Sequence, residues 1–134
     1  MRHSLSFSLS YADTDPSGLV YFATWFPWME RCQSAWFHQH GLRQDTMLAE
    51  HGFGTVTRWA ECDYRAATAL YDSITVTATV AELGRSSFTT QHDFVRATDD
   101  VLVARGRLVV VTVAPDGGSV PLPDLVRRTL EETP

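Results

Sequence analysis

The chain contains no lysine, because all eleven of its Lys and Arg residues are arginine. Neither a lysine Schiff base nor the lysine of a Walker phosphate-binding loop is therefore available. Cysteine is scarce as well: Cys32 and Cys62 lie far apart and form no CxxC pair. This scarcity argues against a disulfide framework and predicts two free thiols in a reducing cytoplasm.

Positive charge and long apolar runs are also in short supply. Sixteen acidic residues against eleven basic ones give a formal net charge of -5, whereas a nucleic-acid-binding protein normally carries a basic patch. No apolar run reaches the length of a membrane-spanning helix, and residues 1–8 alternate between polar and apolar instead of forming the apolar centre of a signal peptide. We therefore expect a cytoplasmic protein with no nucleic-acid partner and no membrane contact.

The chain does contain enough apolar sequence for a core. Its 134 residues are 44% hydrophobic, which is typical of a single globular domain, here residues 1–134. Apolar and polar residues alternate in several segments, which indicates strands. Strands are predicted over residues 3–11, 55–65, 73–83, 86–97 and 101–114. The run 108–113 is apolar at nearly every position, which predicts a strand covered on both faces.

An aromatic-rich segment over residues 21–40 predicts the one long helix, because its apolar side chains recur at helical spacing and Gly41 can end it. Pro27 lies inside this segment, although proline breaks a helix interior and is tolerated only in a first turn. Two solutions stay open. Either a short turn over 21–25 precedes a helix that starts near Phe26, or the helix is kinked.

Two shorter helices are predicted over residues 43–51 and 125–132. One long helix, five strands and tight turns between the later strands together predict an α+β fold. Its antiparallel sheet would wrap around the long helix.

Asp13 and Asp15 lie in a turn over residues 12–18, just before the long helix. A helix start offers free backbone N–H groups and a partial positive charge. A carboxylate beside such a start is the minimum equipment for attack on a carbonyl group. Two residues apart in an extended turn, one acid can face a pocket while the other caps the backbone. The spacing alone, however, favours a turn-forming role for both.

Metal-binding alternatives find little support. The order of acidic and small residues at 13–18 mimics the opening of a calcium loop, but Thr24 stands where the bidentate Glu is required, and Pro16 interrupts the loop. His38 and His40 are two apart near a helix end, which does not place both rings on one face. No metal site is predicted.

Two motifs of the chain resemble the start of hotdog-fold acyl-CoA thioesterases, and in particular the 4-hydroxybenzoyl-CoA thioesterase family. They are residues 13–22, DTDPSGLVYF, and residues 28–31, WMER. Residues 71–72, YD, and 82–88, ELGRSSF, resemble that family too, so the likeness extends over nearly the full chain. The resemblance implies a hotdog fold, in which a five-stranded antiparallel sheet wraps around one long central helix.

The resemblance also implies the catalytic groups. The second acid of the first motif is the family's catalytic carboxylate, and that position is Asp15. The family's anion hole is a backbone N–H at the helix start, which corresponds to Tyr21 and Phe22. Asp15 would either attack the carbonyl directly or take a proton from water, and the sequence leaves both roles open. Asp13 is expected to be structural.

Binding residues follow from the same resemblance. Gly18, Trp25 and Glu30 would line the acyl pocket, where Glu30 either accepts a hydrogen bond from a substrate hydroxyl or is simply solvated. Arg85 and Ser87 would bind CoA, since the planar guanidinium of arginine suits phosphate. Arg127 and Arg128 are further arginines of the same kind, with less support.

The implied function is hydrolysis of an acyl-CoA thioester, with an aromatic acyl group such as benzoyl or hydroxybenzoyl favoured. Neither a metal nor a cofactor is required, because CoA is part of the substrate. The resemblance implies homodimers that pair their sheets edge to edge, assembled into homotetramers with active sites between subunits. Alternatives are a medium-chain fatty acyl-CoA or acyl-carrier-protein thioesterase and a non-catalytic acyl-CoA-binding protein. A hotdog dehydratase would need a histidine beside the acid, and the motif around Asp15 has none.

Overall fold

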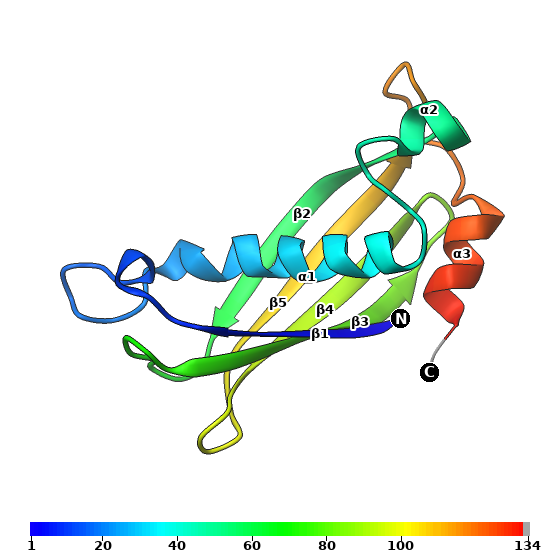
Figure 1. Cartoon of the computed structure of the whole chain (residues 1–134). Helices are drawn as coiled ribbons and strands as arrows, with labels where there is room; N and C mark the ends of the chain where they lie inside the picture. Colours follow the sequence, from blue (N-terminus) through cyan, green and yellow to red (C-terminus); the bar gives the residue numbers. More distant parts are fainter. Residues whose placement is uncertain (133–134) are drawn as a thin grey trace.

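A long helix lies across one face of a twisted sheet in the computed structural model of the protein (Figure 1). The structure describes residues 1–132, so the last two residues of the predicted domain, 133 and 134, lie outside the described residues. The elements follow one another as β1 (Arg2–Ser8), η1 (Tyr11–Asp13), η2 (Phe22–Thr24), α1 (Trp25–Gln39), α2 (Met47–His51), β2 (Gly54–Tyr64), β3 (Ser73–Leu83), β4 (Ser87–Arg96), β5 (Val101–Val113) and α3 (Asp124–Glu131).

All five strands form one antiparallel sheet in the order β1-β3-β4-β5-β2. The helix α1 packs against its inner face, which confirms the α+β class and the hotdog arrangement. Most element bounds agree with the sequence within a few residues. The prediction for the first strand is wrong at its end, because the chain leaves the sheet after Ser8 and Tyr11 begins the 3₁₀ turn η1, with 82% of its surface exposed.

Pro27 is accommodated without a kink, because the first of the two predicted solutions is correct. The 3₁₀ turn η2 precedes α1, and α1 begins at Trp25. Pro27 is thus the third residue of α1, in the first turn, where a missing N–H costs no intrahelical hydrogen bond.

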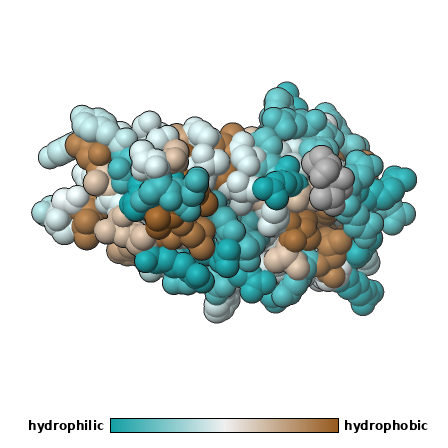
Figure 2. All heavy atoms as spheres, turned by 90° about the horizontal axis from the view of Figure 1, so that it is seen from below, coloured by the Kyte–Doolittle hydropathy of each residue, from teal (hydrophilic) through white to brown (hydrophobic). Residues whose placement is uncertain are grey.

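The strand β5 departs from the prediction that both of its faces are covered. Leu108, Val110 and Thr112 face α1 and are buried, whereas Val109 and Val111 lie on the outer face and stay half-buried. The prediction of cover on both faces is wrong for this chain, because α1 covers only the inner face of the sheet. Viewed from below, the surface is largely hydrophilic, with separate hydrophobic patches (Figure 2).

Close approach of α1 to the sheet depends on Gly106 in β5. A Cβ atom added there would collide with the sulfur of Met29, which is completely buried on α1. An alanine at position 106 would therefore force the Met29 side chain to shift beneath the helix.

A polar network lies buried between α1 and the sheet. The Thr90 hydroxyl donates to Gln33 Oε1 at 2.9 Å, and His92 Nε2 lies 3.0 Å from the same hydroxyl oxygen. Because that hydroxyl has only one hydrogen, His92 donates from Nε2 and its Nδ1 is unprotonated. Within residues 1–132, Nδ1 is buried with no hydrogen-bond partner. Burial lowers the pKa of His92 to about 4.

We expect Gly106→Ala to destabilise the protein by about 1–3 kcal/mol, because the added methyl group overpacks the contact with Met29. Urea unfolding measures the change. Gly54→Ala, also in a strand, is the matched control, since the nearest atom to its new Cβ is Val113 Cγ2 at 3.8 Å, an ordinary contact. Equal stability of the two variants would contradict this account of the core.

We also expect stability to fall on mild acidification because of His92. The unfolded chain takes up a proton on this ring near its ordinary pKa of 6.5, whereas the folded protein does so only near 4. This contribution is complete above pH 6.5 and is lost progressively as the pH falls toward 4, by up to about 3 kcal/mol. Urea unfolding of wild type and His92→Gln across this range tests it. The variant should lack this part of the pH dependence, and identical slopes would contradict the prediction.

Candidate active site

The acidic turn before α1 is closed by its own backbone. The Gly18 amide donates to the Asp15 carbonyl at 2.9 Å, and the Asp15 amide donates to the Leu19 carbonyl at 3.1 Å. Gly18 adopts a φ of +79°, a left-handed conformation that favours glycine. The turn therefore reverses the chain directly behind Asp15 and sends it toward η2 and α1.

The Asp15 carboxylate is held in a defined orientation by this turn. Its Oδ1 accepts hydrogen bonds from the Ser17 hydroxyl and from the Ser17 amide, the latter at 2.8 Å. These bonds, the hydroxyl foremost, lower the pKa of Asp15 below its usual range. Both end on Oδ1, so within residues 1–132 Oδ2 has no hydrogen-bond partner. The acid thus forms the turn and still presents one ionised oxygen.

Asp13 has a different task. Its Oδ2 accepts hydrogen bonds from the Ser10 amide at 2.7 Å and from the Ser10 hydroxyl at 3.2 Å, which caps η1. Its backbone carbonyl accepts the Tyr21 amide at 2.8 Å. Asp13 is therefore structural, as the resemblance implied.

The two amides expected to form an anion hole are not equivalent. Because the Tyr21 N–H already donates to the Asp13 carbonyl, it is not free for a substrate. The Phe22 N–H has no hydrogen-bond partner within residues 1–132, since Phe22 is the first residue of η2. Of the predicted pair, only the Phe22 amide is free to donate a hydrogen bond to an anionic oxygen.

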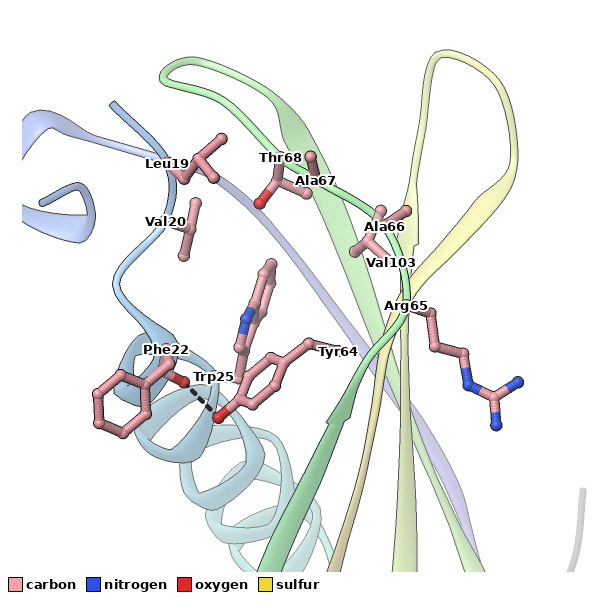
Figure 3. A pocket seen from close by; sticks show the side chains of 10 residues that line it. All are labelled: Leu19, Val20, Phe22, Trp25, Tyr64, Arg65, Ala66, Ala67, Thr68 and Val103. Carbon is pink, nitrogen blue, oxygen red and sulfur yellow. Dashed lines mark hydrogen bonds between the residues drawn. The ribbon is translucent and has the colours of Figure 1, made fainter. Parts of the chain in front are cut away.

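A cavity of about 370 Å³ adjoins this helix start. Its walls come from residues 19–25, from residues 64–68 after β2 and from Val103 of β5, as Figure 3 shows. Trp25, which the resemblance assigns to an acyl pocket, is buried at its side, whereas the Arg65 side chain points away from the cavity. Gly18 and Glu30 do not line it. Glu30 is exposed on α1.

The wall formed by the connection between β2 and β3 is fixed by an arginine. Arg96 donates to the Ala67 carbonyl at 2.7 Å and is itself held by Asp99 through bonds of 3.0 and 2.9 Å. The amides of residues 65 and 66 both donate to the Val103 carbonyl. This side of the cavity is therefore anchored to the sheet at two points.

Sequence reasoning missed most of the residues around the cavity. Leu19 and Val20 belong to the first motif but have no predicted role, and no role is predicted for Tyr64 or residues 66–68. Their common feature, proximity to Trp25, arises from packing of the β2–β3 connection against the helix start. No local pattern of these residues signals it.

The predicted CoA-binding residues lie elsewhere in the chain. Arg85 lies in the turn between β3 and β4 and Ser87 begins β4, next to α3, whereas Asp15 lies beyond the opposite end of α1 (Figure 1). The fifteen residues of α1 span about 22 Å. One chain therefore does not bring these residues to Asp15. Arg127 lies at the same turn, where it donates to the Gly84 carbonyl at 2.7 Å.

The part of the chain that the structure describes has neither a metal-binding cluster nor a membrane-spanning helix. Residues 1–132 contain no group of three or more His, Cys, Asp or Glu side chains placed to hold a metal ion. In the same range, none of the helices combines the length and the apolar character needed to cross a membrane.

Comparison with known proteins agrees with this geometry. Residues 9–130 match the sequence profile described as the thioesterase-like superfamily. The chain belongs to this superfamily. Among curated relatives, the acyl-CoA thioesterase YbgC of Haemophilus influenzae is 28% identical over 88 residues, which cover 66% of this chain and 65% of that protein. The acyl-CoA thioester hydrolase YbgC of Shigella flexneri is 27% identical over 105 residues, which cover 78% of this chain and 77% of that protein. The match to the first relative thus spans just under two thirds of its length.

Solved structures in the thioesterase-like superfamily share the fold. A 1,4-dihydroxy-2-naphthoyl-CoA thioesterase from Synechocystis superposes with a TM-score of 0.89 at 21% identity, covering 98% of this chain and 97% of that one. The 4-hydroxybenzoyl-CoA thioesterase from Pseudomonas sp. strain CBS-3 gives 0.86 at 22% identity, covering 96% and 98%. At these identities the likeness establishes the fold alone.

We expect Ser17→Ala to raise the pKa of Asp15 toward its ordinary value, because the Ser17 hydroxyl is the main cause of the lowered pKa. An acid titration that follows the Asp15 side-chain carboxyl resonance by NMR measures it. Ser10→Ala is the matched control, since it removes the hydroxyl donor of the neighbouring Asp13 instead. An unchanged Asp15 pKa in Ser17→Ala would contradict the described turn.

Proposed function

We propose that this protein hydrolyses an acyl-CoA thioester to the free acid and CoA, with Asp15 as the reacting carboxylate. One observation carries the proposal: an ionised carboxylate stands in the turn that leads to a helix start, where the Phe22 amide is free and an apolar cavity adjoins. Membership of the thioesterase-like superfamily and the names of the YbgC relatives support it.

In the proposed reaction, the thioester oxygen accepts a hydrogen bond from the Phe22 N–H at the positive end of α1. Asp15 Oδ2 bonds to the carbonyl carbon, the carbon–sulfur bond breaks, and the CoA thiolate leaves and takes a proton from water. Water then hydrolyses the mixed anhydride and restores the carboxylate. The lowered pKa of Asp15 keeps the carboxylate ionised, as a nucleophile must be.

The cavity supports an aromatic acyl group. Its lining includes Leu19, Val20 and Val103, and the flat indole of Trp25 suits contact with a ring. Because Glu30 does not belong to that lining, one chain offers no carboxylate to a ring hydroxyl, and a benzoyl group fits better than a hydroxybenzoyl group. The chemistry asks for neither a metal nor a cofactor, since a thiolate is a good leaving group.

An edge-paired homodimer would complete the site. The strand β2 is an edge of the sheet, eleven residues long and exposed along much of its length, and such an edge readily pairs with another chain. Since Gly54 pairs with Val113 and Ser87 with Val111, the start of β2 and the start of β4 share one end of the sheet. Antiparallel β2–β2 pairing would turn that end of the second subunit toward the Asp15 end of the first.

This reversal supports a role in CoA binding for the partner's Arg85 and the partner's Ser87, which one chain keeps away from its own Asp15. Two dimers would then stack into a homotetramer through the outer face of the sheet. Trp59 on that face is 58% exposed and Val56 is 49% exposed, and both would be covered.

Asp15→Asn should fold normally and lose activity roughly a thousandfold, because an amide is neither a nucleophile nor a base. Release of the CoA thiol from benzoyl-CoA, followed with a thiol reagent, measures it. Asp116→Asn is the matched control, because Asp116 Oδ1 accepts the amide two residues on, that of Gly118, at 2.8 Å in a turn after β5. Near-normal turnover in a folded Asp15→Asn protein would refute the catalytic assignment.

The same assay on wild type separates the alternatives. Hydrolysis of octanoyl-CoA but not of benzoyl-CoA would replace the aromatic acyl group with a fatty one, and a preference for octanoyl-acyl-carrier protein would replace CoA. Tight binding of acyl-CoA without thiol release would identify a binding protein.

A further inference from the structure

Tyr64, the last residue of β2, reaches across the cavity to the helix start. Its hydroxyl donates a hydrogen bond of 2.7 Å to the backbone carbonyl of Phe22, the residue whose N–H is free (Figure 3). The Tyr64 ring forms part of the cavity wall, as Trp25 does. One side chain of the sheet thus contacts the residue that would bind the thioester oxygen.

This contact is the one hydrogen bond between residues 19–24 and the sheet in the described part of the chain. The Tyr21 amide and the Thr24 hydroxyl both donate to the Asp13 carbonyl, at 2.8 and 3.3 Å. Those bonds join the turn to the acidic loop, and that loop does not belong to the sheet. The bond from Tyr64 is therefore the polar contact that ties the turn directly to the sheet, beside the apolar contacts of Val20 with the core.

Packing of the Phe22 side chain does little to replace this hydrogen bond. The Phe22 side chain is 60% exposed, and its ring points away from the cavity in Figure 3. Partial burial raises the pKa of the Tyr64 phenol, so the hydroxyl keeps its proton and remains a donor at neutral and mildly alkaline pH. The bond therefore persists at neutral pH, where the carboxylate of Asp15 is ionised.

We propose that Tyr64 is the positioning residue of the anion hole, and this inference rests on the proposed function. By holding the Phe22 carbonyl, its hydroxyl fixes the position of the residue whose N–H would bind the thioester oxygen. A donor to a developing oxyanion is effective only when its position is fixed in advance. Loss of the hydroxyl should therefore weaken binding of the transition state more than binding of the substrate.

Tyr64→Phe tests this, because it removes the hydroxyl and keeps the ring in the cavity wall. With benzoyl-CoA, or with the acyl-CoA that wild type hydrolyses fastest, we expect kcat to fall about tenfold, the effect of losing one neutral hydrogen bond. KM should stay within about twofold. Binding of S-benzyl-CoA, which lacks the carbonyl oxygen, should be unchanged, because it makes no use of the anion hole.

Tyr71→Phe is the matched control, since its ring is 77% exposed and its hydroxyl has no hydrogen-bond partner within residues 1–132; its kcat should equal that of wild type. An unchanged kcat in Tyr64→Phe overturns the inference while leaving the proposed function intact. A lower urea midpoint together with weaker S-benzyl-CoA binding also overturns it, because Tyr64 would then be structural. A wild type that hydrolyses no acyl-CoA overturns the proposed function and this inference with it.

Discussion

The hydrogen bond from the Tyr21 amide to the Asp13 carbonyl holds the acidic loop against the start of α1. It closes the loop that carries Asp15 and ends next to the free amide of Phe22. The Gly18 turn shortens the path, and the Ser17 donors orient the acid within it. The Asp15 carboxylate and the Phe22 amide, the groups proposed for catalysis, are therefore placed by local backbone geometry, and the sheet contributes part of the cavity wall at the helix start.

This local character explains why the acidic turn and the helix start could be predicted from the sequence. Alternation located the strands, and an acid a few residues before an aromatic helix located Asp15. Pro27 could be placed in a first turn by the rule that governs proline. Local patterns do not show which backbone N–H groups already have a hydrogen-bond partner. The Tyr21 N–H has one because the folded loop brings the Asp13 carbonyl next to it.

The cavity also depends on contacts that local sequence patterns do not show. Tyr64 and residues 66–68 meet Trp25 only because the β2–β3 connection crosses the helix start, held there by Arg96. Distances across a fold were equally out of reach. Arg85 and Ser87 resemble family positions, yet one chain keeps them at the far end of α1, and only the proposed pairing of edges would bring a partner's copies toward Asp15. Cover on both faces of β5 failed for a similar reason, because a run of valines does not say which layer covers its outer face.

The buried chain from His92 through Thr90 to Gln33 has a consequence for how the helix is seated. If α1 slid along the sheet by one turn, about 5.4 Å, the Gln33 amide would enter apolar surroundings and leave the Thr90 hydroxyl unsatisfied. Apolar contacts alone discriminate weakly between such sliding positions, whereas a buried polar pair accepts one. The network therefore specifies one position of α1 along the sheet. It thereby keeps the N-terminus of the helix beside the cavity that the substrate would occupy.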